Sequence, residues 1–503
     1  MLLAKGINSI ILWVLLIPSS TFSTKIVFEF DRRLSHSSRD LLPNFDGKKE
    51  ELPPDQYFEQ KLDHFNLSNG ETWQQRYWAN WRYYTATGPA ILWIEGENWA
   101  YPNGIIDGQW VSYAEIFKGV IFSLEHRFYG RSVPKNDTST ENLVYLSSQQ
   151  ALADIAFFIQ GITKQYYLSD DIKWIVFGCS YAGNLAAWVR MKYPSLVHGA
   201  VASSAPILAK ADFGEYYQVV KASLDSYHPN CSSRIAEATQ QLDRLIKTEA
   251  GRKHITKLFQ LCTELQDSLS DIASFFQKLA TQVANVVQYN KAYRKSNNEI
   301  PPRRSIEHLC DIMTYSDASA LDLYAAFHIV NLVQGRYTCR YHTDEKYIEK
   351  LRKTDINTIL GGSGNRQWTY QTCTEFGYYQ RSSTTSDTFG IPLLSEQDVK
   401  LCEKVFGPEF NETRLKNGIY RTNTIYGGLQ VNVGNIIFVH GSVDPWHPLG
   451  ITRVESKNSP YKVVFINGTS HCGDLNYYDK DIDEVKEARK KIQKIMQSWL
   501  QNK

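Results

Sequence analysis

The sequence has no excess of either charge and no long run of one sign. Lys and Arg together number 55 and Asp and Glu 53, which gives a formal net charge of +2 over 503 residues. A nucleic-acid binder needs a basic patch to neutralise phosphates, so this balance argues against that class. A repeat of fixed period is also lacking. The 17 prolines and 30 glycines are close to average numbers, which excludes collagen-like and low-complexity chains.

What the sequence does contain is an ordinary globular composition. Hydrophobic residues make up 43% of the chain and charged residues 21%, unlike the charged and aromatic-poor composition of disordered proteins. The length corresponds to roughly two to four domains of about 150 residues each.

The first 23 residues are typical of a secretory signal peptide. Lys5 precedes a short apolar run at 7–17, and a stretch of mostly small polar residues follows at 19–23. The run is shorter than the ~20 residues that a membrane-spanning helix needs, and no later stretch is long and apolar enough. We therefore predict a cleaved signal peptide at 1–23 and no stable membrane span. An uncleaved anchor is the alternative.

Sequons and cysteines fit a secretory route. Eight cysteines are present without a C-x-x-C pair or a Cys/His cluster of zinc spacing, so they favour disulfides and predict no metal site. Six of them lie in the middle of the chain, while Cys179 and Cys472 adjoin the candidate catalytic residues described below. The spacing leaves the pairing open. The predicted glycosylation sites in N-x-[ST] sequons are Asn66, Asn136, Asn230, Asn411 and Asn467.

Short apolar runs alternate with helical patterns at both ends of the chain. Nearly continuous apolar runs predict parallel strands buried on both faces, and their alternation with helices predicts an α/β fold. The buried-strand pattern stops between about residues 205 and 431, where amphipathic helices are predicted at 235–248 and 268–287. We therefore predict a signal peptide (1–23), a first sheet segment (24–204), an inserted helical cap domain (205–431) and a second sheet segment (432–503). The predicted strands are 90–94, 120–124, 174–177, 199–203, 436–439 and 463–466, and the predicted helices of the sheet segments are 149–162, 184–191 and 481–500.

Ser180 is the candidate nucleophile. It lies in GCSYAG (178–183), after a predicted strand and before a predicted helix, which is the context of a nucleophile elbow. Small residues on both sides allow the tight turn. Ala182 stands where the consensus has glycine, a departure that weakens the motif without excluding it.

A nucleophilic serine needs a base and an acid that orients this base. Asp444 and His471 each follow a predicted strand by a few residues, in the chain order Ser, Asp, His of α/β-hydrolases. His440 and His447 compete for the role of base, but neither follows a strand of its own. For the oxyanion hole we predict the N–H of Tyr181, directly after the nucleophile, and the loop at Gly96 after an earlier strand. A plain glycine turn is the alternative for that loop.

Seven motifs are spread along the chain from residue 57 to residue 472. They are YFEQKLDHFN (57–66), TWQQRY (72–77), EHRFYGRS (125–132), QQALAD (149–154), QTCTEFGYYQ (371–380), DPW (444–446) and SHC (470–472). These motifs resemble the serine carboxypeptidase family that includes lysosomal Pro-X carboxypeptidase, dipeptidyl peptidase II and thymus-specific serine protease, and the SHC form is nearest to the thymus-specific branch. The resemblance implies an α/β-hydrolase sheet with an inserted, disulfide-stapled helical cap, the triad Ser180, Asp444 and His471, and an exopeptidase acting beside proline.

The resemblance also implies disulfides and a subsite region. The implied pairs are Cys231–Cys310, Cys262–Cys339 and Cys373–Cys402. Candidates for the substrate-binding region are Glu375, Phe376, Tyr378 and Tyr379, because aromatic faces pack well against a proline ring. Core packing beside Cys373 is an equally good explanation of these four residues.

The resulting hypothesis is a secreted or lysosomal serine exopeptidase that hydrolyses peptides. We expect it to need no cofactor, and a homodimer is one possible oligomeric state. A lipase or esterase on the same fold is one alternative, and a catalytically silent binding protein is another. The sequence leaves open whether the carboxyl or the amino end of the peptide is recognised, since the former needs a cationic or N–H-rich pocket and the latter a carboxylate.

Overall fold

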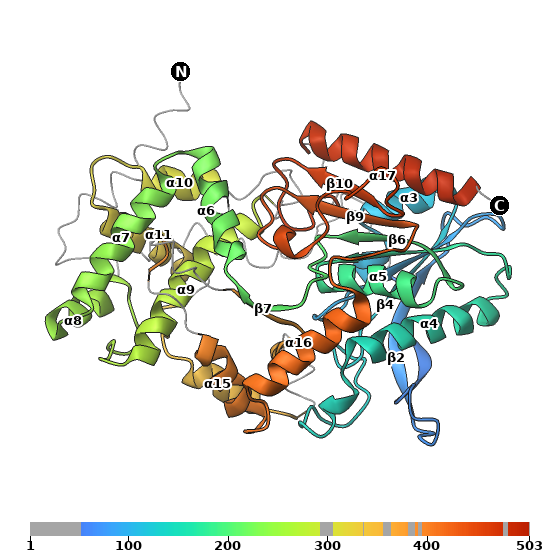
Figure 1. The fold of residues 1–503 in the computed structure, drawn as a ribbon, viewed down its shortest axis with the longest axis horizontal. Helices are drawn as coiled ribbons and strands as arrows, with labels where there is room; N and C mark the ends of the chain where they lie inside the picture. The colour runs from blue at the N-terminus through green and yellow to red at the C-terminus, as the bar shows by residue number, and fades with distance from the viewer. Residues whose placement is uncertain are drawn as a thin grey trace.

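The computed structural model describes residues 52–291, 305–334, 337–355, 364–380, 388–390, 395–475 and 481–501. The predicted signal peptide lies outside these residues. Figure 1 shows a part rich in strands, formed by both ends of the described chain, beside a helical part formed by its middle. Within the described chain, no helix has the length and apolar character that crossing a bilayer requires.

The central sheet has eight strands in the order β1-β2-β4-β3-β5-β6-β9-β10. The six strands from β4 to β10 are parallel and contain all six predicted strands. Two antiparallel strands, β1 and β2, were not predicted, because buried polar residues such as Gln60 and Arg76 interrupt their apolar pattern. The strands are β1 (Gln56–Lys61), β2 (Thr72–Asn80), β3 (Ala90–Ile94), β4 (Val120–Leu124), β5 (Trp174–Cys179), β6 (Val197–Ser203), β9 (Ile436–Gly441) and β10 (Lys462–Ile466).

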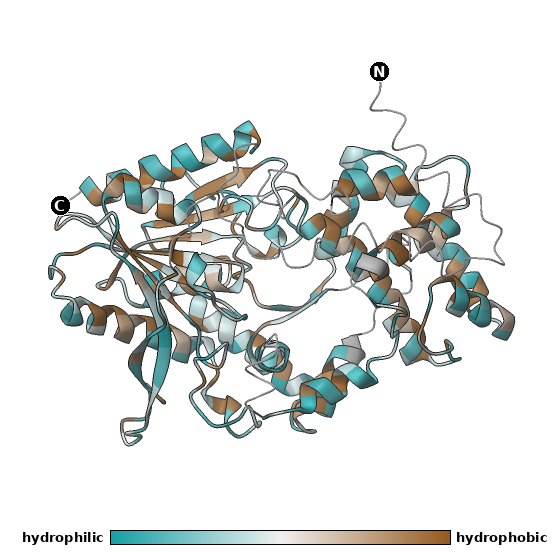
Figure 2. Cartoon of the chain, turned by 180° about the vertical axis from the view of Figure 1, so that it is seen from behind, coloured by the Kyte–Doolittle hydropathy of each residue, from teal (hydrophilic) through white to brown (hydrophobic). Residues whose placement is uncertain are grey.

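Helices cover both faces of this sheet. α4 (Ser148–Gln165) and α5 (Tyr181–Lys192) pack on one face, and α3 (Gln109–Phe117) and α17 (Asp483–Gln501) pack on the other. Figure 2 shows apolar residues in the central strands of the sheet, while the outer helices mix polar and apolar residues. The chain therefore has the α/β-hydrolase fold class that the sequence predicts.

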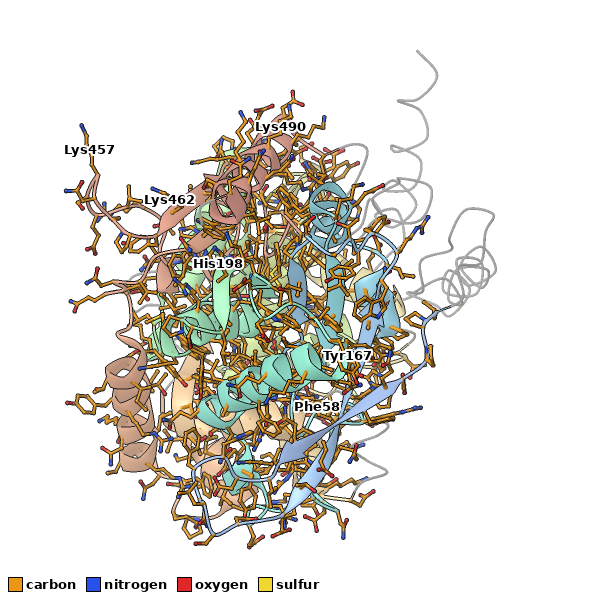
Figure 3. All side chains as sticks on the ribbon, turned by 90° about the vertical axis from the view of Figure 1, so that its right-hand side faces the viewer. Phe58, Tyr167, His198, Lys457, Lys462 and Lys490 are labelled. Carbon is orange, nitrogen blue, oxygen red and sulfur yellow. A yellow bond between two sulfur atoms is a disulfide. The ribbon has the colours of Figure 1, made fainter. Side chains whose placement is uncertain are left out.

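Three lysines lie around the edge of the sheet at β10. The side chains of Lys457, Lys462 and Lys490, from the loop before β10, from β10 itself and from α17, point outward (Figure 3). Lys462 is exposed at the first position of this edge strand. Charged side chains on an edge strand discourage pairing with another chain, so a dimer through continuation of this sheet is not favoured. A homodimer through another surface stays a prediction.

The middle of the chain is helical, as expected. The structure also contains a short parallel pair, β7 (Lys210–Phe213) and β8 (Gly377–Gln380), which the sequence pattern did not predict. The division into domains at 204 and 431 stays a prediction. The helices are α6 (Glu215–Tyr227), α7 (Cys231–Leu245), α8 (Glu249–Leu258), α9 (Leu269–Gln288), α10 (Ile306–Met313), α11 (Ala320–Gln334), α12 (Glu345–Arg352), α14 (Asn365–Gln371), α15 (Ser395–Phe406) and α16 (Glu412–Tyr426).

The helix predicted at 235–248 ends earlier than expected. α7 ends at Leu245, and a separate helix, α8, begins at Glu249. The break occurs because the hydroxyl oxygen of Thr248 accepts the N–H of Gly251 at 3.0 Å and caps the new helix.

Buried ion pairs connect four of the motifs that carry the family resemblance. Arg127, which is fully buried, donates from Nε and Nη2 to the two carboxylate oxygens of Asp154 at 2.6 Å each. His64 Nε2 lies 2.8 Å from the same carboxylate. Arg76 makes a similar pair with the buried Glu125. These motif residues fix the β1–β2 hairpin to α4 and β4, and none of them belongs to the candidate triad.

Removal of one partner of the Arg127–Asp154 pair is expected to lower the stability of the fold more than removal of both partners. Arg127→Met leaves a buried carboxylate without its main counter-charge, so the free energy of unfolding should fall by ~3–5 kcal/mol. The double variant Arg127→Met/Asp154→Leu leaves no such charge and should lose less than the single variant. Urea unfolding of the three proteins gives this comparison. A double variant less stable than Arg127→Met would contradict the expectation.

Candidate active site

Ser180 lies at the turn between β5 and α5 in a strained backbone conformation. Its φ is 60° and its ψ is −128°, a region that non-glycine residues rarely adopt and that clusters at active sites. The turn also requires small neighbours. A Cβ on Gly178 would lie 2.0 Å from the carbonyl oxygen of Ala182, and a Cβ on Gly183 would lie 2.7 Å from that of Ser203. This strand–turn–helix geometry is that of a nucleophile elbow.

Asp444 and His471 form a buried hydrogen-bonded pair. His471 Nδ1 lies 2.9 Å from Asp444 Oδ1, and the two residues are 6% and 0% exposed. Because a carboxylate can only accept, Nδ1 carries the proton, which leaves Nε2 as an acceptor. Burial alone would raise the pKa of Asp444. The charge and hydrogen bond of His471, the N–H of Trp446 and the hydroxyl of Ser204 outweigh burial and lower the pKa below its usual value.

The end of β6 contacts both of these regions. The carbonyl oxygen of Ser203 accepts the N–H of Ser180 at 2.9 Å, and the hydroxyl oxygen of Ser204 accepts the N–H of Cys472 at 2.8 Å. Sequence reasoning did not identify Ser203 and Ser204 as site residues. Their position directly at the end of a predicted parallel strand was the signal that could have indicated them.

The two competing histidines lie in other surroundings. His440 is 1% exposed, and burial lowers its pKa to about 4. Within the described part of the chain, neither of its ring nitrogens has a hydrogen-bond partner. His447 Nδ1 donates to the backbone carbonyl of Asp444 rather than to the carboxylate. The geometry favours His471 as the base.

The expected oxyanion residues adjoin the elbow. Tyr181 is the first residue of α5, a position whose N–H has no acceptor within a helix. A Cβ placed on Gly96 would lie 3.5 Å from the Cβ of Ala182, so the loop after β3 contacts the elbow directly. An anion at this point would also face the positive end of the α5 dipole.

The side chain of Tyr181 belongs to a chain of buried hydrogen bonds. Tyr129 donates to Gln371 Oε1 at 2.7 Å, and Gln371 Nε2 donates to the Tyr181 hydroxyl at 2.9 Å. His126 Nδ1 lies 2.8 Å from the carbonyl of Arg127 and therefore carries the proton, so its Nε2 accepts from Tyr181 at 3.0 Å. Burial lowers the pKa of His126 to about 4, which agrees with a neutral ring.

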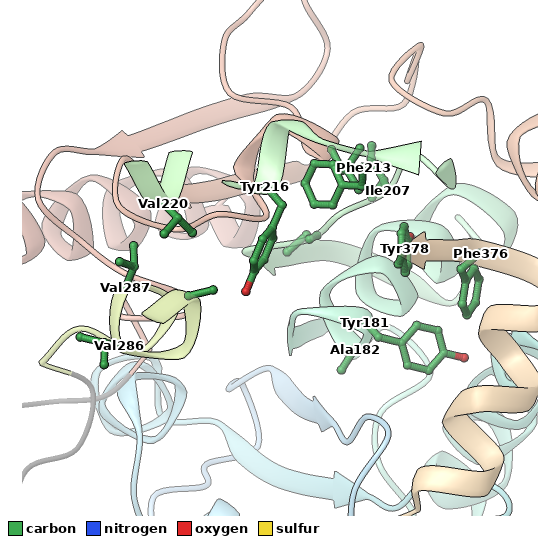
Figure 4. Close-up of a cluster of buried hydrophobic side chains, with 14 of the residues drawn as sticks. Tyr181, Ala182, Ile207, Phe213, Tyr216, Val220, Val286, Val287, Phe376 and Tyr378 are labelled. Atoms are coloured by element: carbon green, nitrogen blue, oxygen red, sulfur yellow. The ribbon is translucent and has the colours of Figure 1, made fainter. Parts of the chain in front are cut away.

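The four subsite candidates lie in one region but in different surroundings. Glu375 is 3% exposed, and its two oxygens accept the N–H of Ser148 at 3.1 and 2.9 Å. Phe376 is fully buried, with its ring 5.3 Å from Tyr181 and 5.4 Å from Tyr378. Figure 4 shows these three rings grouped at one end of an apolar cluster.

An aromatic cavity of about 230 Å³ lies beside these residues. Tyr378 and Tyr379 line it together with Trp368 and Trp446, and Trp446 is two residues beyond Asp444. A second cavity of about 520 Å³ is lined by residues such as Pro89 and contains none of the candidate site residues. It lies at the amino ends of β3 and β5, whereas Ser180 follows the carboxyl end of β5. The smaller cavity is therefore the one that lies near the candidate catalytic residues.

Four disulfides are present, and one joins the site. Three of them pair the cysteines of the middle region in the way that the family resemblance implies. The fourth, whose pairing the sequence left open, links the residue before Ser180 to the residue after His471. The pairs are Cys231–Cys310, Cys262–Cys339, Cys373–Cys402 and Cys179–Cys472.

Known proteins resemble this chain along most of its length. The profile of the family described as serine carboxypeptidase S28 matches residues 60–492. The thymus-specific serine protease of Mus musculus is 34% identical over 465 residues, covering 90% of this chain and 88% of that protein. The lysosomal Pro-X carboxypeptidase of Mus musculus is 28% identical over 456 residues, covering 88% of each. Among solved structures, a proline iminopeptidase of Mycobacterium smegmatis has 10% identity and a TM-score of 0.38 over 88% of this chain and 99% of that chain.

Replacement of Glu375 should change how stability depends on pH. Burial raises the pKa of Glu375 from its usual value of 4.5 to about 7. As the pH rises from 4.5 through 7, the unfolded chain releases this proton before the folded one, so the folded state loses stability over that window. Glutamine does not titrate. The melting temperature of Glu375→Gln relative to wild type should therefore rise by a few degrees between pH 5 and pH 8.

Thermal unfolding at several pH values measures this difference. Gln497→Ala, at an exposed position on α17 that carries no titratable group, is the control and should show a difference from wild type that stays constant with pH. A constant difference for Glu375→Gln as well would mean that this carboxyl group titrates normally.

Proposed function

Because this chain belongs to the serine carboxypeptidase S28 family and is a serine-type peptidase, we propose that it is an exopeptidase that works through Ser180, Asp444 and His471. The observation that carries the proposal is the buried 2.9 Å hydrogen bond between His471 and Asp444. This pair follows the ends of β9 and β10, and the strained Ser180 elbow follows the end of β5 in the same parallel sheet.

The proposed reaction is acyl transfer through an acyl-enzyme. Ser180 Oγ attacks the scissile carbonyl while His471 Nε2 takes its proton, and the imidazolium then gives a proton to the leaving amine. Asp444 stays ionised because its pKa is lowered, so it holds the tautomer of His471 and offsets the imidazolium charge. The N–H of Tyr181 and the loop at Gly96 stabilise the oxyanion.

For the substrate we propose a peptide with proline next to the scissile bond. Two observations support this choice. The cavity beside the acid is lined by Tyr378, Tyr379, Trp368 and Trp446, and a flat proline ring packs well on aromatic faces. In addition, one of the relatives is named a Pro-X carboxypeptidase. The ring of Phe376 lies 5.4 Å from that of Tyr378 and 6.0 Å from that of Trp368, so it packs against two of the lining rings.

We propose that the protein follows the secretory pathway and is secreted or lysosomal. Four disulfides fit an oxidising compartment, and one relative is named as lysosomal. The asparagines of all five sequons are exposed, as glycosylation requires. They are Asn66, Asn136, Asn230, Asn411 and Asn467.

Ser180→Ala should fold normally but lose hydrolysis. Only binding and the oxyanion hole then remain, so turnover of a proline peptide should fall on the order of 10³-fold or more. The variant should also lose covalent labelling by a fluorophosphonate probe, and mass spectrometry of the labelled wild type should locate the probe on Ser180. Ser498→Ala, an exposed serine on α17, is the control and should behave like wild type. Activity of Ser180→Ala within about tenfold of wild type would reject the elbow assignment.

A panel of short peptides tests the specificity. Proline beside the scissile bond should give a kcat/KM about tenfold or more above that of the matched alanine peptide. Each peptide is offered with a free amino end, with a free carboxyl end and with both ends blocked. An exopeptidase should leave the doubly blocked peptides intact and cleave one of the other two sets. Equal turnover of blocked and free peptides would show an endopeptidase instead.

A further inference from the structure

The Cys179–Cys472 disulfide lies between the nucleophile and the base. We propose that this bond positions Ser180 and His471 relative to each other, and that an external dithiol which reduces it lowers the activity of the enzyme reversibly. Cys179 and Cys472 are thus positioning residues rather than catalytic ones. The proposal rests on the proposed function of Ser180 and His471.

The bond crosses the sheet where the catalytic residues meet. Cys179 is the last residue of β5, while Cys472 lies in the loop after β10, and the two are 293 residues apart in sequence. β6 and β9 lie between those strands in the sheet. The two Cα atoms are nevertheless only 5.9 Å apart. One peptide unit on each side of the bond leads to Ser180 and to His471, so this covalent path between them is short.

The sulfur atoms also lie beside the imidazole ring. One ring nitrogen of His471 and the two sulfurs lie within 4.8 Å of one another. Cys472 is 7% exposed, while Cys179 is partly exposed. The disulfide therefore fills the space next to the ring as well as joining the two loops, and its loss would leave the ring both less tethered and less tightly packed.

Besides the disulfide, the His471 loop is held by several hydrogen bonds and by ring packing, with the Tyr289 centroid 6.2 Å from that of His471. The N–H of His471 donates to the carbonyl of Gln288 at 3.0 Å, and the N–H of Cys472 donates to Ser204 at 2.8 Å. Each such bond contributes about 1 kcal/mol net, and the first of them depends on α9 in the helical middle of the chain. Proton transfer from Ser180 needs an alignment that a displacement of about 1 Å already spoils. Loss of the covalent path should therefore affect the chemical step more than substrate binding.

Reduction can proceed by ordinary thiol–disulfide exchange. A thiolate of the dithiol attacks the Sγ of Cys179, which is the more exposed of the two residues, and the Cys179–Cys472 bond breaks with Cys472 leaving as the thiolate. The second thiol of the reductant then attacks the mixed disulfide and releases Cys179. The dithiol ends as a disulfide, and both cysteines end as thiols after Cys472 takes up a proton. Two electrons pass from the reductant to the protein.

The first experiment compares two double variants, each of which lacks one disulfide. Cys179→Ala/Cys472→Ala should lower kcat by about 10- to 100-fold and leave KM within about threefold. Fluorophosphonate labelling of Ser180 should slow in parallel with kcat. Cys231→Ala/Cys310→Ala removes a buried disulfide between α7 and α10. It should lower the melting temperature but leave kcat within about twofold. An unchanged kcat in the first variant would overturn the proposal.

The second experiment uses the wild-type protein, so it does not depend on the folding of a variant. Dithiothreitol is added under native conditions in the presence of EDTA, because two thiols beside an imidazole could bind zinc. Alkylation and peptide mapping then give the reduced fraction of each pair. Activity should fall with the reduced fraction of Cys179–Cys472 and return on reoxidation.

Full reduction of this pair with unchanged kcat would overturn the proposal. Loss that follows the reduction of another pair would overturn it as well. If the untreated wild type neither hydrolyses the peptides nor labels at Ser180, the proposed function fails instead. The two failures are therefore distinguishable.

Discussion

The carboxyl end of β6 holds together the loops on which the candidate chemistry depends. Ser203 accepts the N–H of Ser180 through its carbonyl oxygen, and Ser204 accepts the N–H of Cys472 through its hydroxyl. The N–H of Ser204 donates to Val439 of β9 at 2.7 Å. Because β6 lies between β5 and β9, the candidate nucleophile on one side and the candidate acid on the other both contact these two residues. Parallel strands make this arrangement available, since their carboxyl ends meet at one edge of the sheet.

The helical middle of the chain completes the site rather than only covering it. Gln288, the last residue of α9, accepts the N–H of His471 with its carbonyl oxygen, and its side-chain Oε1 accepts from Trp446 at 3.1 Å and from Tyr216 at 2.7 Å. One residue thus connects the loop of the base, the turn of the acid and helix α6. Because Trp446 also lines the aromatic cavity, Gln288 connects this cavity to the loop of His471.

The features that could be predicted from the sequence are those with a local signal. β3 to β6, β9 and β10 are apolar on both faces, and Ser180, Asp444 and His471 each follow one of them, so strands and candidate triad could be predicted together. β1 and β2 could not, because their polar residues, such as Gln60 and Arg76, are buried through contacts with distant parts of the chain. The same holds for Gln288 and for the Cys179–Cys472 pair. Their roles arise from positions that only the folded chain brings together.

Three buried titratable groups that have no ion-pair partner among the described residues make the stability of the folded protein depend on pH. Glu375 has a pKa of about 7, while His126 and His440 have values of about 4, in each case because burial disfavours the charged form. Between these values all three groups are neutral in the folded protein. Below pH 6.5 His126 and His440 take up protons in the unfolded chain but stay neutral in the folded protein. These two residues therefore lower the free energy of unfolding as the pH falls towards 4. Glu375 costs stability in the opposite direction, as the pH rises from 4.5 through 7. The contributions of the two histidines and of Glu375 therefore oppose each other between pH 4.5 and 6.5.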